Sequence, residues 1–178
     1  METLIFEKTS EVKKNSRELE SKLKVKITVQ GKKVSFEGQS LDEYEASRIL
    51  EAINFGFSAK KALILLDQDM QFRRVNIKGF TRRKNLEDVR ARIIGTEGQV
   101  KRTIESLSDC YLAIQGNTIG VIAHADEIEE IITALHNLVR GSKQANVYRF
   151  LEEMNRYRKL SGKDLGLKIE KSSKLNKK

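Results

Sequence analysis

The sequence predicts an α+β protein of two tandem modules, each a three-stranded sheet packed on helices. Three observations predict this fold. Short apolar runs alternate as strands do, apolar residues between them recur at helical spacing, and the chain matches itself at an offset of 85 residues. In the clearer module the predicted order is strand, helix, helix, strand, strand, helix.

The first half of this module, which begins at residue 71, contains one strand and two helices. Residues 72–77 form a strand-like run, and helical spacing from Leu86 onward stops at Gly95. A second amphipathic helix begins near Gln99, with apolar residues at positions 100, 104 and 107. The two predicted helices are therefore separated by a very short loop.

The second half contains a hairpin and a final helix. Alternating apolar residues at 110–114 and 119–123 flank Gly116-Asn117, a pair that favours a tight turn between strands. The last helix opens at Asp126 and ends at Gly141, a residue suited to a helix C-terminus.

The internal repeat predicts a second copy of the module near the N-terminus. Ile27 and Val29 align with Leu112 and Ile114, and the match continues through the final helix. It fails before Leu19, because Gly95 and Gly98 fall on Ser10 and Lys13 and too few residues remain for a first helix. We therefore predict a degenerate module that lacks the interhelical loop.

The predicted divisions of the chain follow from these patterns. They are a degenerate module at 1–57, a connecting helix at 58–70, an intact module at 71–142, a docked helix at 143–160 and a disordered basic tail at 161–178.

Charge indicates a polyanionic partner. The net charge is +9, and residues 71–105 carry ten Lys or Arg against four Asp or Glu. Residues 155–178 carry nine against two. Such clusters gain affinity by releasing condensed counterions from nucleic acid, although a generally basic surface kept for solubility is the alternative.

The loop Gly95-Thr96-Glu97-Gly98 is the motif most indicative of function. Placed between two short helices and followed by a hairpin, it has the KH arrangement, in which a GxxG loop clamps the backbone of four nucleotides. Glycine lets phosphates approach the backbone, and a helix N-terminus favours an anion. The predicted RNA-binding residues are Arg92, Ile93, Ile94, Gly95, Thr96, Glu97, Gly98, Val100, Lys101, Arg102, Leu112 and Ile114.

Catalysis is not indicated. His124 and His136 lack neighbouring ligands at metal spacing, and Cys110 has no activating base at a recognisable spacing. We therefore expect no enzymatic activity, metal or cofactor. A single cysteine and the lack of an apolar membrane span predict a cytoplasmic protein.

Residues 79–105 and 147–151 resemble the second KH domain, and the segment after it, of the partner-of-Nob small-subunit ribosome assembly factors, an archaeal-type rRNA-processing family. The resemblance implies two type I KH domains and binding of single-stranded RNA near the 3′ end of small-subunit rRNA. It further implies association with the rRNA 3′-end endonuclease and with the alpha subunit of translation initiation factor two. A KH scaffold, or a binder associated with mRNA or the exosome, is the alternative.

Overall fold

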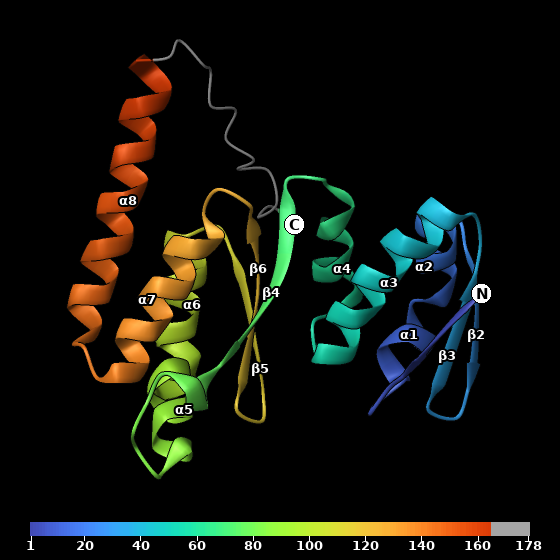
Figure 1. The fold of residues 1–178 in the computed structure, drawn as a ribbon, viewed down its shortest axis with the longest axis horizontal. Helices are drawn as coiled ribbons and strands as arrows, with labels where there is room; N and C mark the ends of the chain where they lie inside the picture. The colour runs from blue at the N-terminus through green and yellow to red at the C-terminus, as the bar shows by residue number, and fades with distance from the viewer. Residues whose placement is uncertain (165–178) are drawn as a thin grey trace.

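The computed structural model describes residues 1–164, with the side chains of residues 1–160. The fold is α+β as predicted, with two three-stranded antiparallel sheets and helices between them (Figure 1). The strand order is β1-β3-β2 in one sheet and β4-β6-β5 in the other. In each sheet the second strand of the hairpin is therefore central, and its first strand is an edge.

The second unit has the predicted order of elements. Its elements are β4 (Met70–Asn76), α5 (Leu86–Ile94), α6 (Gln99–Leu107), β5 (Tyr111–Gln115), β6 (Thr118–His124) and α7 (Ile128–Arg140). Ile77, expected at the end of the first strand, lies instead in a 3₁₀ turn. The turn begins there because the Asn76 side chain accepts the Lys78 N–H at 2.9 Å, which a continuing strand would not permit.

The first unit repeats this order in a shortened form. Its elements are β1 (Glu2–Ile5), α1 (Ser10–Lys14), α2 (Ser16–Leu23), β2 (Lys26–Gln30), β3 (Lys33–Glu37) and α3 (Ser40–Phe55). The expectation of no first helix was wrong, because α1 is present, although it has five residues. Residues 6–15 connect β1 to α2, whereas the longer stretch 77–98 connects β4 to α6. Ser10 and Lys13, which align with the two loop glycines, lie inside α1, so no loop can form there.

The repeat extends to individual hydrogen bonds. Glu20 Oε1 accepts the Ile27 N–H at 2.8 Å, and Glu105 Oε1 accepts the Leu112 N–H at the same distance. Both pairs are related by the offset of 85 residues. Each carboxylate therefore ties the second helix of its unit to the edge strand beside it.

An aromatic cluster joins the two units. Phe72 lies on the face of the second sheet that packs against the first unit. Its ring lies at centroid distances of 5.7 Å from Phe55 and 5.8 Å from Phe57. Gly120 on β6 leaves room for these rings, since a Cβ there would lie 2.5 Å from the Phe55 ring. Ile122 belongs to the same buried cluster as the N-terminal core. The units thus share one continuous apolar face.

A short connector runs between the units. Helix α4 (Ala59–Ala62) is followed by a 3₁₀ turn (Leu63–Leu66), and α3 and α4 both stand between the two sheets (Figure 1). The sequence places Ala59, Ala62, Leu63 and Leu66 at helical spacing in this connector. The first three are buried, whereas Leu66 is only partly buried and Leu65 is buried instead, because residues 63–66 form a 3₁₀ turn.

The last helix, α8 (Gln144–Asp164), packs on the second unit through Val147 and Leu151. The side chain of Arg158 pairs with Glu127 and Glu130 at the start of α7. The helix runs past the predicted limit of residue 160, and positions 165–178 of the predicted tail lie outside the described residues. Among the described helices, none is long and apolar enough to cross a membrane.

We expect Gly120→Ala to destabilise the whole chain, because the added methyl would collide with the Phe55 ring. Overpacking costs about 1 to 3 kcal/mol, and each kcal/mol lowers Tm by roughly 2 to 4 °C in a chain of this size. Thermal unfolding followed by circular dichroism measures the effect. Gly79→Ala is the control, since a Cβ at Gly79 meets nothing within 4 Å. Equal Tm values for the two variants would contradict the packing described.

Candidate nucleic-acid interface

The loop between α5 and α6 has a backbone that ordinary residues adopt poorly. Gly95 has φ 73° and ψ 173°, a region that is essentially restricted to glycine. Glu97 and Gly98 are both left-handed, with φ of 52° and 75°. The chain therefore reverses between the two helices within four residues, as the sequence predicted.

The two glycines serve different purposes. A Cβ on Gly95 would lie 2.4 Å from Val100 Cγ2 and 2.8 Å from Val100 N, so this residue allows the loop to pack on α6. A Cβ on Gly98 would approach nothing closer than Arg102 Nε at 4.0 Å. Close packing therefore explains why residue 95 is a glycine, but it does not explain the glycine at 98. The surface at Gly98 is open, beside the start of α6.

Positive charge surrounds this open surface. Helix α6 begins at Gln99, so its unpaired N–H groups and the positive end of its dipole lie at the loop. The Arg102 guanidinium donates to the Glu97 carbonyl and braces the loop while remaining exposed. An anion at the loop would meet both the helix terminus and this guanidinium.

Some of the apolar residues predicted to bind RNA are buried and others are accessible. Ile93, Val100 and Leu112 are at most 4% exposed and belong to the core of the second unit. Ile94 is 38% exposed, and Ile114 is partly buried. A ligand could thus touch Ile94 and Ile114, whereas the other three support the surface from beneath.

Arg92 was predicted to contact RNA, but its guanidinium is turned away from the loop. Nη2 donates to the carbonyl of Gly141 at 2.9 Å and also to that of Ser142. These carbonyls lie at the C-terminus of α7, where a cation is favoured. The charge therefore caps a helix, and we do not include Arg92 among the proposed RNA contacts.

A hollow of about 380 Å³ lies along the edge strand β5, beside Lys101 of α6. Lys101 of α6 and residues 112–114 of β5 form one side of it. The other side comes from residues 55–58 and from Lys61 on α4. This second side, which comes from the end of the first unit and from the connector, was not predicted from the sequence. The available signal was a basic position on the polar face of the connecting helix.

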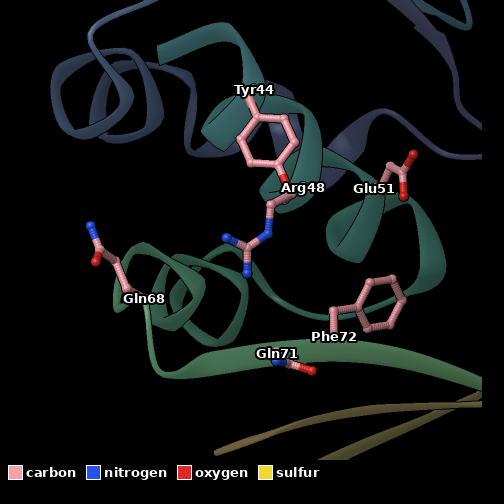
Figure 2. A pocket seen from close by; sticks show the side chains of 6 residues that line it. All are labelled: Tyr44, Arg48, Glu51, Gln68, Gln71 and Phe72. Carbon is pink, nitrogen blue, oxygen red and sulfur yellow. The ribbon is translucent and has the colours of Figure 1, made fainter. Parts of the chain in front are cut away.

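A second hollow of about 370 Å³ lies at the opposite edge of the same sheet, between α3 and the start of β4 (Figure 2). Its lining residues are Tyr44, Arg48, Glu51, Gln68, Gln71 and Phe72. The Arg48 guanidinium points toward β4 and donates to the Met70 carbonyl at 3.0 Å. This hollow is thus a seam between the units, away from the GTEG loop.

Cys110 and His124, which were considered for catalysis, lie in settings that do not resemble a catalytic or metal site. Cys110 is 2% exposed, and burial raises the pKa of its thiol, which keeps the sulfur protonated. Imidazole nitrogens of His124 lie 3.9 Å from Asp69 and 3.7 Å from Asp126. Among the described residues, no cluster of His, Cys, Asp or Glu has the arrangement of a metal site.

The element order, the sheet order and the GTEG loop define a KH-domain protein of type I. Residues 71–156 match the eukaryotic-type KH domain (KH-domain type I) in the form of the second KH domain of the partner-of-Nob proteins. This match and the structures described below make the second unit similar to the partner-of-Nob (Dim2-type) KH proteins.

Similar proteins occur in archaea. A KH domain-containing protein of Methanocaldococcus jannaschii is 30% identical over 110 residues, which cover 61% of this chain and 48% of that protein. The chain therefore matches about half the length of this curated relative. A protein of unknown function from Aeropyrum pernix has a similar structure, with TM-score 0.77, 25% identity and coverage of 92% and 96% of the two chains.

Two structures from Pyrococcus horikoshii OT3 are also similar, each with TM-score 0.76 and 28% identity. One is Dim2p, where the match covers 85% of this chain and 98% of that one. The other is an a/eIF2alpha–aDim2p–rRNA complex, where it covers 88% and 94%.

We expect Gly95→Ala to destabilise the chain more than Gly98→Ala. The first substitution combines a glycine-only backbone with a collision against Val100, at a cost of roughly 2 to 5 kcal/mol. The second adds left-handed strain of about 1 to 2 kcal/mol without a collision. Urea unfolding of both variants measures the difference, and equal midpoints would contradict the distinction drawn between the two glycines.

Proposed function

We propose that this chain binds single-stranded RNA through the GTEG loop of its second KH unit. The open surface at Gly98 carries the proposal. A left-handed glycine with no neighbour to accommodate is unexplained by packing, but it gives a phosphate access to the backbone beside a helix N-terminus.

The proposed RNA is small-subunit rRNA near its 3′ end, bound during assembly of the ribosomal subunit. The match of residues 71–156 to the second KH domain of the partner-of-Nob proteins supports this role, and so does the likeness to Dim2p in a complex with rRNA and a/eIF2alpha. The same likeness supports the alpha subunit of initiation factor two as a protein partner. The role is one of binding without catalysis, in the cytoplasm.

The proposed contacts are the loop residues Gly95 to Gly98, the side chains of Lys101 and Arg102, and the accessible Ile94 and Ile114. Glu97 places a carboxylate in the clamp, so the cations beside it must supply more of the phosphate attraction. The first unit has no equivalent clamp, because helix α1 occupies the aligned positions.

The proposal predicts that Gly98→Asp weakens RNA binding by about 1 to 3 kcal/mol, which is roughly fivefold to 150-fold. Aspartate tolerates a left-handed backbone better than most residues, so the loop should keep its shape. A labelled RNA from the 3′ end of small-subunit rRNA is titrated with protein, and fluorescence anisotropy reports binding.

Two controls separate charge from shape. Gly98→Asn adds a side chain of the same size without a charge and should cost less affinity than Gly98→Asp. Ser10→Asp adds the same charge at the aligned position of the first unit and should leave binding unchanged. Equal losses from Gly98→Asp and Ser10→Asp would refute the assignment of binding to the second unit.

A further inference from the structure

The edge strand β5 faces a hollow to which both units contribute. In the second sheet β5 has β6 on one side, and the described residues place no strand on its other side. The hollow at this free edge has a volume of about 380 Å³, within the range of about 300 to 1,000 Å³ that is usual for small-ligand sites. It is therefore large enough for a ligand group that forms hydrogen bonds with backbone polar groups along the strand edge.

Charge in this hollow is cationic and incompletely neutralised. Lys61 Nζ lies 3.9 Å and Lys101 Nζ lies 3.6 Å from the same oxygen, Glu105 Oε1. That oxygen also accepts the Leu112 N–H. One carboxylate thus faces two ammonium groups, and partly exposed pairs of this kind are individually weak. Either lysine could turn to an incoming phosphate or base oxygen at little cost.

The fold positions Lys61 beside β5. Its Nζ lies 4.9 Å from the centre of the Tyr111 ring, a cation–π distance. The neighbouring Ala59 and Ala62 are buried in the core, so helix α4 has one orientation relative to β5. Lys60, one residue earlier, is exposed and is not part of the lining of the hollow. The structure thus distinguishes two adjacent lysines of the same helix.

We infer that the RNA groove of the second KH unit is completed by the connector, with Lys61 as an RNA-contacting residue. The inference rests on the proposed function, because it concerns the same RNA. RNA leaving the GTEG clamp passes Lys101 and lies between β5 on one side and residues 55–58 and Lys61 on the other. The degenerate first unit, which has no loop of its own, and the connector therefore supply one wall of the groove together.

The test compares Lys61→Gln with Lys60→Gln in the full chain, using the same labelled single-stranded RNA at several salt concentrations. Lys61→Gln should weaken binding about threefold to tenfold, and if it contacts a phosphate the salt slope should fall by about 0.7. Lys60→Gln should resemble the unmodified protein. Lys61→Arg retains the charge and should retain most of the affinity.

Thermal unfolding of each variant shows whether a change in binding comes from a loss of stability. If Lys61→Gln binds as Lys60→Gln does while Gly98→Asp still weakens binding, the inference about the connector is wrong and the proposed function stands. If Gly98→Asp has no effect, the proposed function itself fails. If Lys61→Gln loses affinity and also has a lower Tm than Lys60→Gln, the loss has a structural cause and the inference is overturned.

Discussion

The packing of Phe55 and Phe57 against the outer face of the second sheet is the contact on which the arrangement of the molecule depends. It requires a residue without a side chain at Gly120 and buries Ile122 in the core of the first unit. Aromatic pairs of this kind contribute about 0.5 to 1.5 kcal/mol beyond the area they bury. Because the connector begins at these rings, the same contact determines which residues lie beside β5.

The candidate site is a four-residue turn between two helices. The absence of a side chain at Gly95 lets the GTEG turn pack on α6, and the absence of one at Gly98 keeps the adjoining surface open. Arg102 braces the Glu97 carbonyl from the same helix. A clamp prepared in this way loses little conformational entropy when a backbone binds, which favours affinity without large side-chain contacts.

Sequence patterns predicted the element order, the repeat and the loop, because each follows from local periodicity or from glycine placement. Features that depend on distant contacts were not predictable. Arg92 was assigned to RNA, but its guanidinium reaches carbonyls that are 49 and 50 positions away in the chain. Lys61 was not identified, because the choice between Lys60 and Lys61 depends on how α4 packs. The short helix α1 was missed because few residues precede Ser10 and Lys13, the positions that align with the two loop glycines.

The most direct test of RNA binding at the GTEG loop is a map of backbone amide chemical shifts during titration with single-stranded RNA. The largest changes should occur at Gly95 to Lys101, along β5, and at Ser58 to Lys61. The loop-free segment Ser10–Lys14 and the outer strand β1 should change little. Changes confined to the first sheet or to α8, with an unperturbed GTEG loop, would contradict the proposed site.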